Sequence, residues 1–88
     1  MAMEIRRPSA DELSTLGVFT WPTWECEPST FDWSYSDKES CYLLEGQVTV
    51  EAEGESVSFG KGDFVVFPKG LKCVWKVTAP VRKHYRFG

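Results

Sequence analysis

Residues 60–77 read Gly-Lys-Gly-Asp-Phe-Val-Val-Phe-Pro-Lys-Gly-Leu-Lys-Cys-Val-Trp-Lys-Val and decide the fold. The segment 60–63 has turn composition, and the apolar run Phe64–Phe67 that follows it is short enough for one strand. Pro68-Lys69-Gly70 predicts a second turn. From residue 71 apolar and polar residues alternate as in a strand with one buried face. This stretch therefore predicts two strands separated by a tight turn.

The same pattern continues on both sides of this stretch. Further short strand-like segments lie at 41–44, 47–52, 56–59 and 81–87. Turns are expected at Glu45-Gly46 and at Glu53-Gly54-Glu55, and the last alternating segment follows Pro80. Short strands with such frequent turns predict an all-β fold, an antiparallel sandwich or barrel.

The N-terminal segment has a different pattern. Ser9 can cap a helix, and Glu12 three residues later can complete a capping box. The helix should end at Gly17. Residues 1–17 are thus expected to form an arm with a short helix outside the main fold, and residues 18–88 the barrel. Pro22 restricts the next segment, 18–27, to an edge strand or an extended arm.

The composition of the chain argues against some classes of function. The chain has 88 residues, 42% hydrophobic and 15% aromatic, with a net charge of −3. This suits one folded domain and argues against binding to nucleic acid or an anionic membrane. No apolar run approaches the length of a membrane span and no secretory signal is visible, so a cytoplasmic protein is expected.

A chain this short buries limited surface, which favours a homodimer. Candidate contacts are Trp21, Trp24 and the exposed edge strands.

The turn spacing resembles the cupin family. Cupins carry a first motif that ends in E-x6-G and a second motif written G-x5-P-x-G-x2-H-x3-N. Here Glu39 and Gly46 match the first, and Gly62, Pro68 and Gly70 match the second. The chain is most similar to small single-domain cupins related to ureidoglycine aminohydrolase and an ethanolamine-utilisation protein. The resemblance implies a jelly-roll barrel that often dimerises.

The metal-ligand positions of the cupin motifs are replaced. Trp33 and Tyr35 stand where the first motif has two histidines, and Cys73 stands at the histidine of the second. Of the four usual ligands only Glu39 is retained. Metal sites usually need three or four imidazole, thiolate or carboxylate donors. We therefore expect no tight metal site and no cofactor.

The resemblance also indicates which side chains should face the barrel cavity. It points Trp33, Tyr35, Glu39 and Cys73 inward, and alternation along the strands adds three more. These are Cys41, Trp75 and Lys83. Trp33 and Trp75 could simply fill the interior, or they could form a stacking wall for a planar or cyclic ligand.

The polar candidates have alternative interpretations. Glu39 could pair structurally with Lys83 or with the Tyr35 hydroxyl, or it could anchor a ligand or act as a general base assisted by Tyr35. Cys73 could be an inert buried thiol, a metal ligand or a nucleophile. His84 alternates with Arg82 and Arg86, so it is expected on the outer face.

Three classes of function follow. The first is a metal-independent barrel that binds a small molecule in its mouth. The second is an enzyme acting on a small polar metabolite, nitrogenous or sugar-like, with Glu39 and Tyr35 or Cys73 in the barrel. The third is a structural or partner-binding barrel with a filled interior. An open cavity would favour the first two, and a packed interior the third.

Overall fold

Two long strands form the centre of the fold in the computed structural model, which describes residues 3–88. Strand β4 spans Glu39–Ala52 and β7 spans Lys72–Phe87. They pair antiparallel from Glu39 opposite Phe87 to Glu51 opposite Val74. Both alternate buried and exposed residues, which is why one face of this pair turns toward a core.

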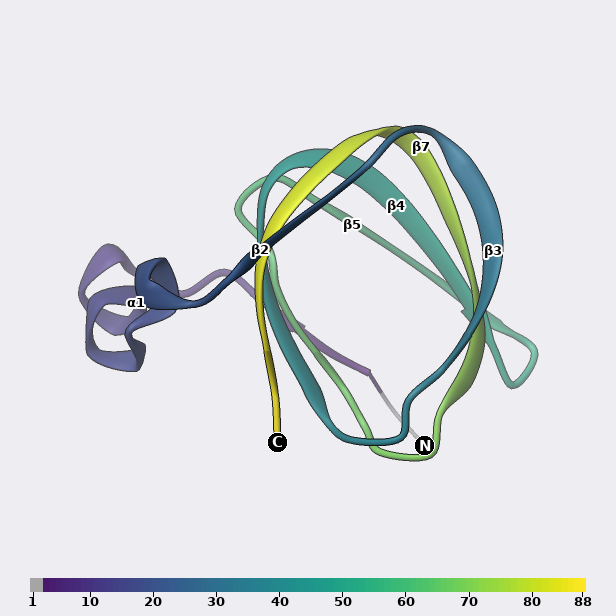
Figure 1. The fold of residues 1–88 in the computed structure, drawn as a ribbon, viewed down its shortest axis with the longest axis horizontal. Coiled ribbons are helices and arrows are strands. Elements are labelled where there is room, and N and C mark those ends of the chain that lie inside the picture. The colour runs from purple at the N-terminus through teal and green to yellow at the C-terminus, as the bar shows by residue number, and fades with distance from the viewer. Residues whose placement is uncertain (1–2) are drawn as a thin grey trace.

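The shorter strands attach to the two halves of this central pair. They are β1 (Glu4–Arg6), β2 (Thr23–Cys26), β3 (Ser29–Ser34), β5 (Glu55–Gly60) and β6 (Phe64–Phe67). The first half of β4 pairs with β6, which pairs with β1, while the second half pairs with β5. On the other side, β7 pairs with β3 and then with β2. All pairings are antiparallel, and the strands curve round a common centre as in a jelly roll (Figure 1). The predicted all-β class is confirmed.

The two central strands bend together at Gly46 and Pro80. The register between β4 and β7 shifts between Leu43 and Val48, which marks a bulge. Gly46 has φ of 107°, a conformation that favours glycine. The expected turn at Glu45-Gly46 is therefore wrong. Gly46 and Pro80 both lie at bends inside continuous strands, because a bulge accommodates a glycine and a residue without an N–H while the chain keeps its direction.

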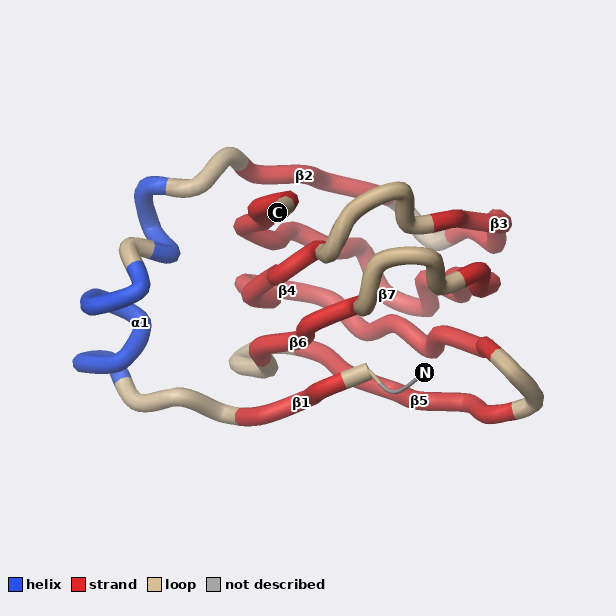
Figure 2. The backbone as a smooth tube through the Cα atoms, turned by 90° about the horizontal axis from the view of Figure 1, so that it is seen from below, coloured by secondary structure: helices blue, strands red, loops and turns tan. Residues whose placement is uncertain are grey.

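The N-terminal helix packs on the outside of the barrel. Helix α1 spans Ala10–Leu16 and is followed by a 3₁₀ turn, η1, at Val18–Thr20. It lies to one side of the strands in both views (Figures 1 and 2). Leu13 and Val18 bury against Phe64 on the outer face of β6. The helix thus has a small core of its own.

The predicted N-cap and C-terminal end of the helix are confirmed, but the predicted capping box is not complete. The Ser9 hydroxyl accepts a hydrogen bond from the Glu12 amide at 3.2 Å, and Gly17 ends the helix with φ of 72°. The Glu12 carboxylate does not complete the capping box, since it pairs with Arg6 instead. Arg6 belongs to β1, an edge strand that the sequence analysis did not anticipate. Its pairing with β6 draws the N-terminal arm into the sheet.

The main core lies inside the barrel. Its fully buried members include aliphatic side chains from both halves of β4 and aromatic ones from β5 and β6, namely Leu43, Val48, Val50, Phe59 and Phe67. The hairpin turn between β4 and β5 forms as expected, with positive φ at Glu53 and Gly54. In residues 3–88 no helix has the length and apolar character needed to cross a bilayer.

Replacing Gly46 by alanine tests the bend. A Cβ there would lie 2.6 Å from the Pro80 carbonyl oxygen and 2.7 Å from the Val81 Cα, both backbone atoms. We expect Gly46→Ala to lower the free energy of unfolding by about 3 kcal/mol, through steric overlap added to backbone strain. Gly54→Ala is the matched control, because Gly54 also has positive φ but no atom within 4 Å of its Cβ position. It should cost about 1 kcal/mol. Equal losses for the two variants in urea denaturation would contradict the role of this bend.

Candidate functional site

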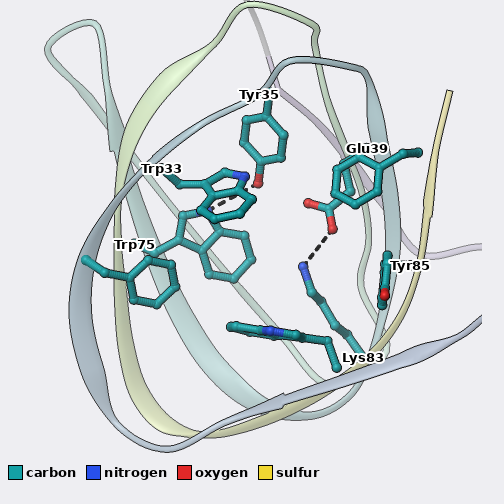
Figure 3. Close-up of a pocket in the computed structure, with 9 residues that line it drawn as sticks. Trp33, Tyr35, Glu39, Trp75, Lys83 and Tyr85 are labelled. Atoms are coloured by element: carbon teal, nitrogen blue, oxygen red, sulfur yellow. Dashed lines mark hydrogen bonds and ion pairs between the residues drawn. The ribbon is translucent and has the colours of Figure 1, made fainter.

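An open cavity of about 230 Å³ lies on the inner side of the barrel. Seven of the nine residues that line it are aromatic. The full set is Trp24, Phe31, Trp33, Tyr35, Glu39, Trp75, Lys83, Tyr85 and Phe87. Figure 3 shows Lys83 reaching across the pocket toward Glu39, with Tyr35 and Trp33 on the far side. The cavity thus combines an aromatic wall with one carboxylate and one ammonium group.

Strand alternation places most of these side chains. Phe31, Trp33 and Tyr35 follow one another at a spacing of two along β3 and just beyond it. Lys83, Tyr85 and Phe87 do the same along the end of β7. Cross-strand pairing then brings the walls together. Phe31 lies opposite Trp75, with the two rings stacked at 6.0 Å, and Trp24 of β2 lies opposite Lys83.

An ion pair lies at the centre of the site. The Lys83 Nζ is 2.8 Å from Glu39 Oε2, and the two residues are only 5% and 3% exposed. The ammonium group also lies over the rings of Trp24 and Trp75, at 5.0 Å and 4.6 Å from their centroids. Ring faces are attractive to a cation, and more so where water is excluded. A carboxylate and two ring faces therefore surround this single ammonium group.

Tyr35 completes the polar network. Its hydroxyl oxygen accepts a hydrogen bond from Trp75 Nε1 at 3.2 Å, and its ring stacks on Phe67 at 4.9 Å. Burial raises the pKa of Tyr35 above its ordinary value, and the negative charge and hydrogen bonding of Glu39 raise it further. Tyr35 is therefore a neutral phenol at physiological pH, able to donate a proton to a hydrogen bond but not to act as a base.

The two cysteines among the candidate residues lie outside the cavity. Cys41 is on the inward face two residues after Glu39, but its short side chain is fully covered by the core. Burial raises the pKa of its thiol to about 12. Cys73 is also buried, two residues from Trp75 on the side away from Lys83, and its Sγ lies 3.7 Å from the Trp33 carbonyl oxygen. Burial raises its pKa as well. The expectation that both face the cavity is corrected, and neither thiol is a nucleophile for it.

The other five candidates line the cavity. Trp33, Tyr35, Glu39, Trp75 and Lys83 come together there. Trp75 is buried, so it fills the interior and also forms a wall. Trp33 is 47% exposed, which excludes the interpretation that it fills the interior. It stands at the mouth, as does Phe87 with the same exposure.

Four lining residues were not among the candidates. Phe31, Tyr85 and Phe87 could have been found, because they continue the alternation of Trp33 and Lys83 along their strands. Trp24 could not, since its position depends on the path of the arm that becomes β2. His84 lies outside the cavity as expected. Its Nδ1 is 2.9 Å from the Trp21 carbonyl oxygen, and Phe19 packs edge-on against its ring.

The donor set does not fit a metal ion. Of the histidine positions in the cupin motifs, Trp33 stands at the mouth, Tyr35 is a neutral phenol and Cys73 lies outside the cavity. The carboxylate of Glu39 is already bound by Lys83. Across residues 3–88, no three His, Cys, Asp or Glu side chains gather closely enough to hold a metal. Glu39 is thus the one carboxylate among the described residues that line the cavity, and Lys83 already binds it.

Comparison with known proteins places this fold and site in a family. The profile of the EutQ-like cupin domain matches residues 13–85. The chain belongs to the EutQ-like cupins. It is similar over nearly its whole length to the crystal structure of a DUF861 family protein from Thermotoga maritima. That match has a TM-score of 0.97 and 50% identity, and it covers 99% of this chain and 100% of the other.

Larger EutQ proteins match only in part. The structure of EutQ from Clostridium difficile has a TM-score of 0.69 and 29% identity, covering 74% of this chain and 52% of that one. The putative ethanolamine utilization protein Q of Salmonella typhimurium gives 0.69 and 28%, covering 74% and 53%. A curated relative, the acetate kinase EutQ of Clostridioides difficile strain 630, is 32% identical over 61 residues, or 69% of this chain. This EutQ-like cupin spans only 39% of the length of that relative.

Removing one member of the ion pair tests its place in the site. Lys83→Met keeps the length of the side chain but leaves the Glu39 carboxylate buried without its partner. We expect the free energy of unfolding to fall by about 3–5 kcal/mol in urea denaturation. The double variant Glu39→Gln/Lys83→Met carries no buried charge and should recover most of that loss. A double variant that is less stable than Lys83→Met alone would contradict a buried, charged pair.

Proposed function

We propose that this EutQ-like cupin binds a small planar or cyclic molecule in the cavity without the help of a metal ion. The observation that carries the proposal is an open cavity with seven aromatic side chains around one buried ion pair. Ligand sites are usually concave and largely apolar, with a few polar groups that fix orientation. Aromatic walls add favourable stacking with a flat ligand.

The mouth of the cavity supports the same proposal. Trp33 and Phe87 remain 47% exposed at the entrance, although large aromatic side chains are normally buried well. Clustered exposed aromatic residues around a concave site are typical of surfaces that bind something. A ligand that enters the cavity would cover both side chains and recover the free energy of burying them.

The other two functions receive less support. A barrel with a filled interior is disfavoured because the cavity is open and contains Glu39. An enzyme acting through Cys73 is disfavoured because that thiol lies outside the cavity. Glu39 with Tyr35 remains the catalytic alternative, but the carboxylate is bound by Lys83 and the phenol is neutral.

We do not extend acetate kinase activity to this chain. That activity is named for a relative of which this chain covers 39%. Phosphoryl transfer depends on groups that cradle phosphates and neutralise their charge. The nine lining residues provide one cation, Lys83, and Glu39 already neutralises it.

The homodimer and the cytoplasmic location stay predictions. Trp21 and Trp24, the candidate dimer contacts, are half-buried within their own chain, Trp21 against Phe64 and Trp24 against Trp75. Each keeps an exposed part that a partner could cover. Other apolar side chains exposed on the described part of the chain outside the cavity include Ile5, Leu16 and Phe19.

The tryptophan side chains provide a direct test of binding. Three of the four, Trp24, Trp33 and Trp75, line the cavity, whereas Trp21 packs outside it on Phe64. In ¹⁵N-labelled protein each indole N–H gives its own NMR signal, assignable with Trp→Phe variants. We titrate a panel of single-ring aromatic and saturated-ring compounds at millimolar concentration. At least one compound should shift the three cavity signals in a saturable way and leave the Trp21 signal unchanged.

A variant at the mouth serves as the matched comparison. Trp33→Ala should weaken binding of such a compound by about tenfold, because one stacking wall is lost. Trp21→Phe should leave binding unchanged, since Trp21 does not touch the cavity. If no compound of the panel moves the cavity signals, or if Trp21 moves with them, the proposal fails.

A further inference from the structure

We infer that Lys83 determines which molecules the cavity accepts: planar rings that carry an oxygen acceptor, a carbonyl or a carboxylate, and not organic cations. This inference rests on the proposed function, because it names the class of ligand for the same cavity. The observation behind it is the setting of the Lys83 ammonium group, which donates to Glu39 and lies over two indole rings at the edge of the cavity.

The ammonium group has more donors than the protein uses. A protonated lysine has three N–H donors. Within residues 3–88, the acceptor found for Lys83 Nζ is Glu39 Oε2, at 2.8 Å. The group's other close neighbours are the rings of Trp24 and Trp75. A ring face attracts a cation but does not provide the lone pair of a carbonyl oxygen. A ligand oxygen would give the ammonium group the second acceptor that the cavity lacks.

The main acceptor of the site, by contrast, is shared. The Glu39 carboxylate accepts a hydrogen bond from Lys83 Nζ and also interacts with the Tyr35 hydroxyl. The Tyr35 oxygen itself accepts a hydrogen bond from Trp75 Nε1. A ligand that brings only donors would therefore have to share the Glu39 carboxylate with Lys83 and Tyr35.

Lys83 also fills the position that a cationic ligand would take. A carboxylate beside two ring faces is the kind of cage that binds organic ammonium groups. Here that cage already holds the ammonium of Lys83, 4.6 Å from the Trp75 centroid. A second ammonium would meet like charge in a poorly hydrated space, where repulsion is strong. The chain thus excludes organic cations with its own side chain.

The size of the cavity fits a single substituted ring. A cavity of about 150 Å³ is enough to hold benzene. The observed volume of about 230 Å³ leaves room for one ring and a small polar substituent. A carbonyl or carboxylate oxygen can accept from an N–H of Lys83 that Glu39 does not use.

The test uses four probes that share one ring. They are benzamide, benzoate, benzylammonium and toluene, each titrated against ¹⁵N-labelled protein with the Trp24, Trp33 and Trp75 indole signals as the readout. We expect benzamide or benzoate to bind at least about tenfold more tightly than toluene, because a hydrogen bond to a charged group is gained. Benzylammonium should give no saturable shift.

Lys83→Met should reverse this order. The variant removes the ammonium and leaves the cage with its carboxylate, so benzylammonium should now bind and benzamide and benzoate should lose their advantage over toluene. The double variant Glu39→Gln/Lys83→Met has neither charge and provides the second measurement if the single variant does not fold. It should bind toluene and benzamide equally and should not bind benzylammonium.

The outcomes separate the inference from the proposed function. If toluene and the polar probes bind the native protein with equal affinity, the cavity is a binding site but Lys83 does not select its ligand, and the inference is overturned. Tight binding of benzylammonium to the native protein overturns it as well. If neither these four probes nor the wider panel moves the cavity signals, the proposed function itself fails.

Discussion

The buried ion pair between Lys83 and Glu39 joins the beginning of β4 to the second half of β7 inside the barrel. Removing two charges from water costs several kcal/mol for each ion, so such a pair persists only with good geometry and further partners. Both conditions are met here. The two charged atoms are 2.8 Å apart, the ammonium lies over two indole rings, and Tyr35 interacts with the carboxylate. The aromatic walls of the cavity are thus also the surroundings that stabilise the pair.

The bend at Gly46 and Pro80 makes this meeting possible. It lets the first half of β4 pair with the second half of β7 in one part of the fold, while the other two halves pair in another. Glu39 and Lys83 belong to the former region, and Trp75 belongs to the latter. In a straight strand, Trp75 and Lys83 would lie far apart along β7. The curvature instead brings the indole within 4.6 Å of the ammonium.

The sequence predicts the fold well because its signals are local. Gly62, Pro68 and Gly70 mark a strand between two turns, and the alternation after them gives the buried face of β7. At Gly46 the sequence predicts a turn where the structure has a bulge, since a glycine that permits a bulge and one that permits a chain reversal look the same in a sequence. Likewise β1 has no signal of its own, because three residues are too few to show an alternating pattern.

The candidate site was predictable where its residues follow strand alternation. It was not predictable where the question is whether an inward side chain lines the cavity or is covered by the core. Alternation places Lys83 and Trp75 inward, and it would have added Phe31 and Phe87. It also places Cys41 and Cys73 inward, but a period of two cannot distinguish a side chain covered by the core from one that lines a cavity. For Glu39 the sequence left a structural partner, Lys83 or the Tyr35 hydroxyl, and a ligand-binding role open. The structure shows that Glu39 pairs with Lys83 and also interacts with Tyr35.

Lys83 binds the Glu39 carboxylate, so the described residues that line the cavity leave no free donor set for a metal ion. Elemental analysis of protein purified without an affinity tag tests it most directly, with the double variant Glu39→Gln/Lys83→Met as the matched control for adventitious metal. We expect zinc, iron, nickel and manganese to stay far below one equivalent per chain and at the same level in both proteins. About one equivalent of any of these metals in the native protein, lost in the double variant and removed only by strong chelation, would contradict the claim.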